Sequence, residues 1–183
     1  MKSFSKAAFI IIVALQVAAL GIMIARRMYL LDTGKKILLQ CEPVDPRSLF
    51  SGDYVILNYK ISRLNKNLLI DDVSNKKDKI KRNDTVYIAL KRDSESNFWQ
   101  ASAISKKIDE LKKNHDVIIQ GRIVSTYRNY RIKYGVESYF VPQYEGLKIE
   151  KNLKDTSVEL AVSGSGESAI RRLFIQGKEV TFY

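Results

Sequence analysis

One long run of apolar side chains lies near the N-terminus of the chain. Residues 8–24 contain no charged residue and only one strongly polar side chain, that of Gln16. A helix of this length rises about 26 Å, and the adjacent Ala7 and Ala25 bring it near the ~20 residues that cross a bilayer. A helix in a soluble core would show a polar face, and this run shows none. The pattern therefore predicts a transmembrane helix.

After this run, apolar and polar side chains alternate over short stretches, as is typical of β-strands. Residues 54–62 place Val55, Leu57, Tyr59 and Ile61 on one face. We predict further strands over residues 35–40, 85–91, 98–104, 117–125, 157–162, 169–175 and 180–182, with 85–91 and 98–104 forming a hairpin. Gly121 marks either a bulge or a point of close packing.

Few helices are expected beyond the first one. Residues 105–114 and 143–153 each suit one short helix, the second with Leu147 and Leu153 as apolar contacts, and the polar residues 63–84 suit a long solvated loop. Many short strands with little helix predict a mainly β fold, either a sandwich or a small barrel. We therefore divide the chain into a membrane anchor, residues 1–30, and a β-rich soluble domain, residues 31–183.

The anchor has alternative interpretations. A cleaved signal peptide would need a small-x-small cleavage site, which is poor here, and Arg26 and Arg27 follow the run directly. Lys2 and Lys6 precede it, so the positive-inside rule leaves the orientation almost balanced. An N-terminus inside and an exported domain is the common arrangement for a single N-terminal span. We expect a single-pass protein of the cytoplasmic (inner) membrane whose C-terminal domain is extracytoplasmic, in the periplasm.

The stretch that leads into the first long strand is the most distinctive in the sequence. Asp45-Pro46 and Ser51-Gly52-Asp53 both predict turns, because proline fixes φ and glycine tolerates positive φ. Residues 52–59 then read Gly-Asp-Tyr-Val-Ile-Leu-Asn-Tyr, which fits G-D-Y-x-x-L-x-Y letter for letter. This segment resembles the signature of the GDYXXLXY family of bacterial membrane-anchored proteins, for which no biochemical activity is established.

Residues 134–142 read Tyr-Gly-Val-Glu-Ser-Tyr-Phe-Val-Pro. This segment resembles a second landmark of the same family, the pattern Y-G-x-E-x-Y-F-V-P. The resemblance thus covers the anchor and essentially the whole domain. The signature residues are Asp45, Pro46, Arg47, Gly52, Asp53, Tyr54, Leu57, Tyr59, Tyr134, Gly135, Glu137, Tyr139, Phe140 and Pro142. We expect them to have structural roles in turns, caps and strands, with Arg47 paired to Asp45, Asp53 or Glu137. The alternative is a site in which Asp53, together with Glu137 or Arg47, contacts a partner or substrate directly.

Tyrosines are dense in residues 127–141, at Tyr127, Tyr130, Tyr134 and Tyr139. One interpretation is an aromatic-rich strand pair at a sheet surface or near the bilayer interface, where tyrosine is common. The other is a binding face that takes a small ligand or an envelope polymer. We favour the first and keep the second as a possible binding face.

The chain is strongly basic, with a formal net charge of +11. A basic domain tethered to a bilayer is attracted to anionic headgroups, so the lipid bilayer is one expected partner. Scattered lysines, no nucleic-acid motif and the anchor argue against nucleic acid. The single cysteine, Cys41, excludes an intramolecular disulfide, and with the single histidine, His115, it cannot form a zinc site.

Catalytic chemistry has little support in the sequence. No P-loop is present, and we expect no cofactor and no metal. The turn after Pro46 resembles the corresponding segment of signal peptidases, whose Ser–Lys mechanism needs a serine before the proline and a buried lysine. Glu42-Pro43-Val44 offers no such serine, although Lys91 could mimic the base. We therefore expect no enzyme activity, with an inactive signal-peptidase relative as the alternative.

Members of the resembled family are often encoded beside polytopic membrane proteins. The resemblance therefore implies a binding or accessory module for another membrane protein of the envelope.

Overall fold

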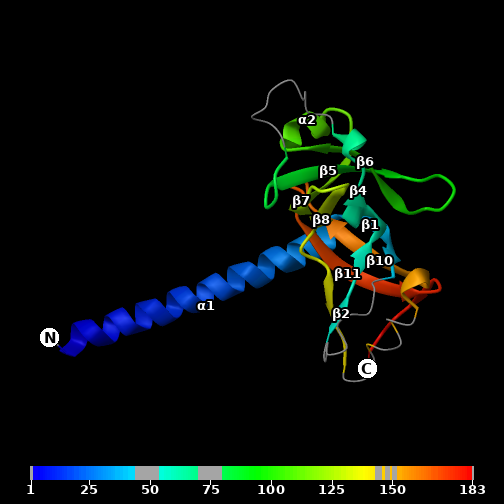
Figure 1. Cartoon of the computed structure of the whole chain (residues 1–183). Coiled ribbons are helices and arrows are strands. Elements are labelled where there is room, and N and C mark those ends of the chain that lie inside the picture. Colours follow the sequence, from blue (N-terminus) through cyan, green and yellow to red (C-terminus); the bar gives the residue numbers. More distant parts are fainter. Residues whose placement is uncertain are drawn as a thin grey trace.

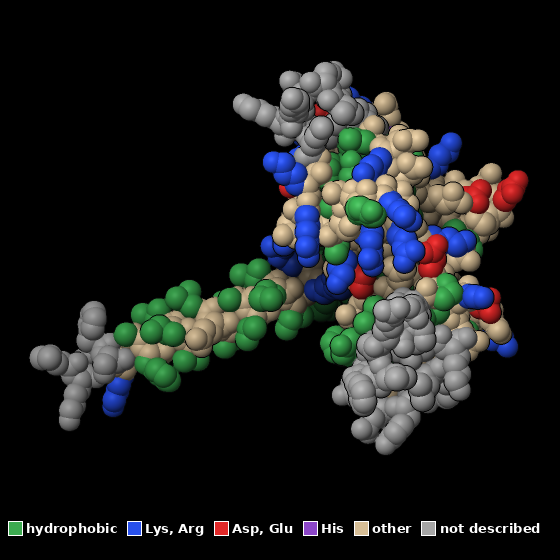
Figure 2. Space-filling view, in the orientation of Figure 1, with side chains coloured by type: hydrophobic (Ala, Val, Ile, Leu, Met, Phe, Trp, Pro, Cys, Tyr) green, Lys and Arg blue, Asp and Glu red, His purple; other side chains and the backbone are tan. Residues whose placement is uncertain are grey.

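The computed structural model describes residues 2–43, 54–69, 80–142, 146, 149 and 152–182, with side chains from Lys6 onward. A long N-terminal helix projects from a β-rich domain (Figure 1). This helix, α1, comprises Lys2–Thr33. Its large apolar side chains from Phe9 to Met28 are exposed (Figure 2), and by length and composition it can cross a membrane. The expected N-terminal apolar helix is confirmed.

The end of α1 is built into the domain. Leu30 is buried, and its carbonyl oxygen accepts a hydrogen bond from the backbone N–H of Gly34 at 2.9 Å. A Cβ at Gly34 would lie 2.5 Å from that oxygen and 3.0 Å from the backbone nitrogen of Val162. Only glycine fits so close an approach of helix end and strand. The helix therefore passes directly into the first strand, at Lys35, without a linker.

In the described part of the chain, two five-stranded sheets and a two-stranded ribbon form the domain, and the pairs between their strands are antiparallel. The first sheet has the order β12 (Lys178–Glu179), β11 (Ser168–Ile175), β10 (Thr156–Val162), β1 (Lys35–Glu42) and β3 (Asn58–Tyr59). The second has the order β4 (Arg63–Leu64), β8 (Tyr130–Lys133), β7 (Val117–Ser125), β5 (Thr85–Arg92) and β6 (Trp99–Ser105). The ribbon consists of β2 (Tyr54–Ile56) and β9 (Ser138–Phe140).

The helical elements within the domain are short. They are the α-helix α2 (Ile108–Lys112) and the 3-10 turns η1 (Lys60–Ser62), η2 (Lys66–Leu68) and η3 (Leu153–Asp155). Gly146 and Ile149 are also helical, and Ile149 and Leu153 are buried, as expected for the region 143–153. Leu147 lies outside the described residues.

One hydrophobic core joins the two sheets. Ile37 and Leu160 of the first sheet and Ile88, Ile104 and Ile119 of the second are almost completely buried in the same cluster. A smaller cluster lies where α2 covers the second sheet, and its members are Ala89, Ala103, Leu111 and Ile118. The predicted mainly β fold is confirmed, including the β5–β6 hairpin. The predicted strand over residues 180–182 is wrong, because the tight turn at Gln176 and Gly177, both with positive φ, begins the last strand already at Lys178, and β12 ends at Glu179.

Residues 54–62 do not form one strand, contrary to the prediction. β2 pairs with β9, whereas β3 pairs with β1, and the chain then turns into η1. The predicted alternation of faces is nevertheless correct, because Val55, Leu57, Tyr59 and Ile61 are all buried. The segment changes strand partners at Leu57 while it keeps one face toward the core.

The described ends of the polar stretch 63–84, residues 63–69 and 80–84, contain a short strand, a 3-10 turn and buried side chains in place of the solvated loop that was predicted. Leu64 belongs to β4, and both Leu64 and Ile80 are buried. Residues 70–79 lie outside the described part of the chain. Gly121 marks close packing, because a Cβ there would lie 2.4 Å from Cγ2 of Ile132. The irregularity in the β7–β8 pairing lies instead between Ile123 and Ser125.

Candidate functional site

The two landmark segments meet in the fold. β2 pairs with β9 so that Val55 lies opposite Tyr139, and the backbone N–H of Leu57 donates to the carbonyl oxygen of Glu137 at 2.7 Å. The segments are adjacent in space although about 80 residues separate them in sequence. We call the β2–β9 pair, Tyr54–Ile56 with Ser138–Phe140, the signature ribbon.

Two buried tyrosines lock the landmarks together through reciprocal hydrogen bonds. The Tyr59 hydroxyl donates to the carbonyl oxygen of Val136 at 2.5 Å, and the Tyr134 hydroxyl donates to that of Ile61 at 2.6 Å. Tyr59 of the first landmark thus binds the backbone within the second landmark. Tyr134 of the second landmark binds the backbone two residues after the first. Because both rings are buried, these hydroxyls need partners, and the backbone carbonyls provide them.

Glu137 holds the turn between β8 and β9. Its carboxylate accepts hydrogen bonds from the backbone N–H groups of Tyr134 and, at 3.0 Å, Gly135. Gly135 has a φ of +78°, a conformation that favours glycine. The partner that a half-buried carboxylate needs at this position is therefore the backbone of its own turn.

Burial controls the ionisation of these groups. It raises the pKa of Tyr59 well above its ordinary value, and the nearby Cys41 and Glu137 add to the effect. Burial also raises the pKa of Tyr134, again with a contribution from Glu137. The pKa of the Cys41 thiol rises to about 12 through burial. All three groups are therefore neutral at physiological pH, and Cys41 is a packing residue.

The opposite face of the signature ribbon is exposed. Tyr54, Ile56 and Phe140 have exposed fractions of 38%, 39% and 76%. Tyr54 and Phe140 lie opposite each other in the ribbon, with ring centroids 6.2 Å apart. In Figure 2, hydrophobic side chains are visible on the domain surface where β2 lies in Figure 1. We call Tyr54, Ile56 and Phe140 the outer patch.

The four tyrosines predicted as one face do not form one. Tyr130 and Tyr134 are buried, Tyr139 is half-buried against Phe182, and Tyr127 is 83% exposed. The predicted strand pair is also wrong, because β8 pairs with β7 and β4 whereas β9 pairs with β2. Buried tyrosine hydroxyls of this domain donate hydrogen bonds to backbone carbonyl oxygens in the core. The density of tyrosines in the sequence did not predict this role.

Five signature residues lie outside the described part of the chain, namely Asp45, Pro46, Arg47, Gly52 and Asp53. The predicted ion pair of Arg47 and the predicted turn at Gly52-Asp53 thus stay predictions. Pro142 is described and is exposed, directly after the buried Val141.

Candidate catalytic and metal-binding groups are few among the described residues. Lys91, the lysine that the sequence offered as a mimic of the Ser–Lys base, lies exposed near the end of β5. Within the described ranges no group of His, Cys, Asp and Glu side chains could hold a metal ion.

The model of the family described as GDYXXLXY protein matches residues 16–173. Neither the curated proteins nor the solved structures contain a match to this chain. The match begins inside the apolar helix and includes both landmarks, so it covers the second half of α1 and most of the domain.

Proposed function

The chain belongs to the GDYXXLXY family, and we propose that it is a single-pass membrane protein whose extracytoplasmic domain binds another membrane protein of the envelope. The outer patch is the observation that carries this proposal. It combines two aromatic rings and an isoleucine on a ribbon whose inner face is fixed in the core. Aromatic side chains on a rigid support are typical of the energetically dominant positions in protein interfaces.

The junction between α1 and the domain supports a partner in the same membrane. Leu30 is buried in the domain, Arg26 lies 3.6 Å from Glu167, and Arg27 donates to the carbonyl oxygen of Ser168 at 3.1 Å. Because helix and domain are joined without a linker, insertion of the helix fixes the height of the outer patch above the bilayer. A partner embedded in that bilayer presents its surface at a fixed height too, which lowers the entropic cost of binding.

Photo-crosslinking in intact membranes tests this proposal. A photoreactive phenylalanine analogue at Phe140 should form adducts with one integral membrane protein. The matched control places the same analogue at Tyr127, which is equally aromatic and more exposed but lies outside the outer patch. Adducts to lipid alone, or the same adducts from both positions, would contradict the proposal.

The orientation is tested separately, because an inverted protein could still bind a membrane partner. The native Cys41 is buried and unreactive, so an introduced cysteine reports its own position. In cells whose outer barrier has been opened, Lys91→Cys should react with an impermeant maleimide. Ser5→Cys should react only after the cytoplasmic membrane is made permeable, and the reverse pattern would contradict an exported domain.

A further inference from the structure

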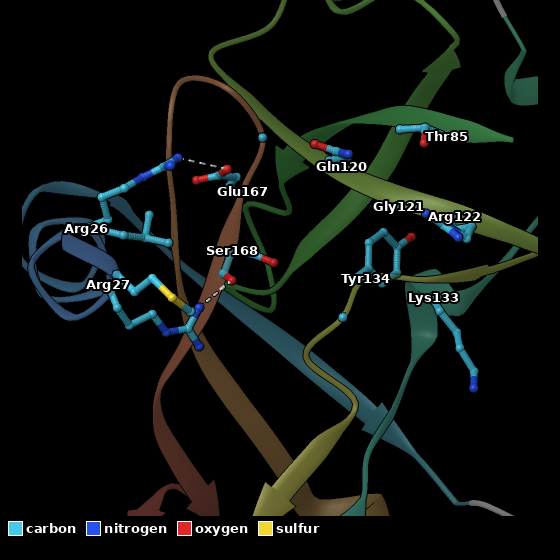
Figure 3. Close-up of a pocket in the computed structure, with 14 residues that line it drawn as sticks. Arg26, Arg27, Thr85, Gln120, Gly121, Arg122, Lys133, Tyr134, Glu167 and Ser168 are labelled. Atoms are coloured by element: carbon cyan, nitrogen blue, oxygen red, sulfur yellow. Dashed lines mark hydrogen bonds and ion pairs between the residues drawn. The ribbon is translucent and has the colours of Figure 1, made fainter. Parts of the chain in front are cut away.

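A cavity of about 570 Å³ lies between the end of α1 and the domain (Figure 3). The helix contributes Met23, Arg26, Arg27 and Leu30, which recur at helical spacing on one face. The domain contributes Arg122 and Lys133 together with polar groups of β5, β7 and the β10–β11 turn. In Figure 3 the two helix arginines lie on one side of the cavity, and Arg122 and Lys133 lie on the other.

The level of this cavity follows from the helix. Met23 belongs to the apolar run, whereas Leu30 is the first helix residue buried in the domain. The rise from Met23 to Leu30 is about 10 Å, which is enough to cross the headgroup layer of roughly 5–8 Å on one side of a bilayer. If α1 spans the membrane, this cavity therefore opens among the lipid headgroups.

The lining of the cavity is positively charged. It includes four basic side chains and one acidic side chain, that of Glu167, which already lies near Arg26. In Figure 2, Lys and Arg side chains gather on the domain where the helix joins it. The cavity thus carries an excess of positive charge at the junction of helix and domain.

The strand register places two of these cations directly opposite each other. Arg122 of β7 pairs with Lys133 of β8. Both side chains are exposed, and among the described residues neither has an ion-pair partner. Like charges directly opposite in a sheet are destabilising, and a bound anion would relieve that repulsion. By contrast, Arg171 and Arg172 on β11 share the carboxylate of Glu159.

Polar groups beside the cations could complete an anion site. Ser168 lines the cavity, and among the described residues its Oγ is the buried side-chain polar atom that has no hydrogen-bond partner. Thr85 lies opposite Arg122 in the β5–β7 pair and also lines the cavity. Guanidinium, ammonium and hydroxyl groups together suit a phosphate group.

We propose that this cavity binds the phosphate-containing headgroup of an anionic phospholipid in the leaflet from which α1 emerges. Arg122 and Lys133 contact the phosphate from the domain, and Arg27 contacts it from the helix. Met23 and Leu30 pack against the glycerol and the upper acyl chain. This proposal concerns lipid and is independent of the protein partner proposed above.

Native mass spectrometry of the purified full-length protein tests the site. The protein in detergent is titrated with phosphatidylglycerol and, separately, with phosphatidylcholine of the same acyl chains. The wild type should prefer phosphatidylglycerol. The variant Arg122→Gln/Lys133→Gln should lose about fivefold in phosphatidylglycerol affinity for each cation removed.

The matched control is Lys91→Gln/Lys113→Gln, which removes two exposed cations outside the cavity. Thermal unfolding confirms that each variant is folded, and Arg27→Gln serves as a second variant if the double variant is not. Equal binding of the two lipids by the wild type, or an equal loss in the control, would overturn the proposal. Full displacement of lipid by excess inorganic phosphate would show a site for a soluble anion, and would overturn the lipid assignment.

Discussion

The two faces of the signature ribbon have the same backbone but very different surroundings. On the inner face, Val55 is fully buried and Tyr139 is half-buried, and the adjoining Leu57 and Tyr59 are fully buried. On the outer face, the three side chains of the outer patch are exposed, and the rings of Tyr54 and Phe140 contact each other. Strand alternation alone separates the two sets, because successive side chains point to opposite sides.

The difference separates two roles within one signature. The inner residues close the core and exchange hydrogen bonds between the landmarks, so their loss should reduce folding. The exposed Tyr54 and Phe140 are not needed to close the core, yet they belong to the same landmarks. The following predictions test this separation, from the largest expected effect to the smallest.

Leu57→Ala should lower the free energy of unfolding by about 2–5 kcal/mol, because it leaves a cavity in a fully buried site. Ile56→Ala, one residue away on the outer face, should change it by less than about 0.5 kcal/mol. Urea unfolding of the full-length protein in detergent measures both values. Similar losses for the two variants would break the distinction between the faces.

Tyr59→Phe should lower the free energy of unfolding by about 1–3 kcal/mol, because the carbonyl oxygen of Val136 loses its buried donor. Tyr127→Phe removes the same hydroxyl from an exposed ring and is the control. The same unfolding experiment compares them. A Tyr59→Phe variant as stable as the control would mean that this hydrogen bond does not hold the landmarks together.

The buried tyrosines also predict a loss of stability at high pH. Burial raises the pKa of Tyr59 and Tyr134 in the folded state above the ordinary value of 10.0. Their contribution to stability is complete below that value and is lost as the pH rises above it, because the unfolded state then releases protons that the folded state keeps. Thermal midpoints of the wild type should therefore fall above about pH 10, and Tyr59→Phe should reduce this fall. An identical alkaline profile for the two proteins would contradict the assignment to Tyr59.

Glu137→Gln should lower the free energy of unfolding by about 1–2 kcal/mol, because an amide retains one of the two acceptor oxygens and loses the charge. Glu167→Gln alters an exposed carboxylate and should change it by less than about 0.5 kcal/mol. Thermal unfolding compares the two variants. A stable Glu137→Gln protein that has lost its partner would instead place Glu137 in a binding site.

The sequence predicted the fold class, the hairpin and the buried face of residues 54–62, because these depend on local alternation. It did not predict the change of strand partner at Leu57 or the bond from Tyr59 to Val136, which joins residues 77 positions apart. Such contacts leave no periodic trace in the sequence. The prediction that the four tyrosines of residues 127–141 share one surface was wrong. A tyrosine can be buried when its hydroxyl donates to a buried carbonyl oxygen, and the sequence does not show where such a carbonyl lies.

The candidate anion site was missed for a related reason. Arg122 and Lys133 each occupy an ordinary exposed position of an alternating strand. Only the register of β7 against β8 places them opposite each other, and only the end of α1 adds Arg26 and Arg27. The sequence did offer one signal for this pair of cations. If residues 117–125 and 130–133 are paired as a hairpin so that their apolar faces coincide, the register brings Arg122 and Lys133 close together.

We propose that the outer patch binds a membrane partner, whereas the inner face only stabilises the fold. The most direct test makes two measurements on Phe140→Ser. One is its thermal midpoint, and the other is the amount of the partner, identified by crosslinking at position 140, that copurifies with it. Leu57→Ala is measured in the same way for comparison. We expect Phe140→Ser to keep the wild-type midpoint and lose the partner, and Leu57→Ala to lose the partner only in proportion to lost folded protein. A Phe140→Ser protein that keeps its partner, or loses it together with its stability, would contradict the account.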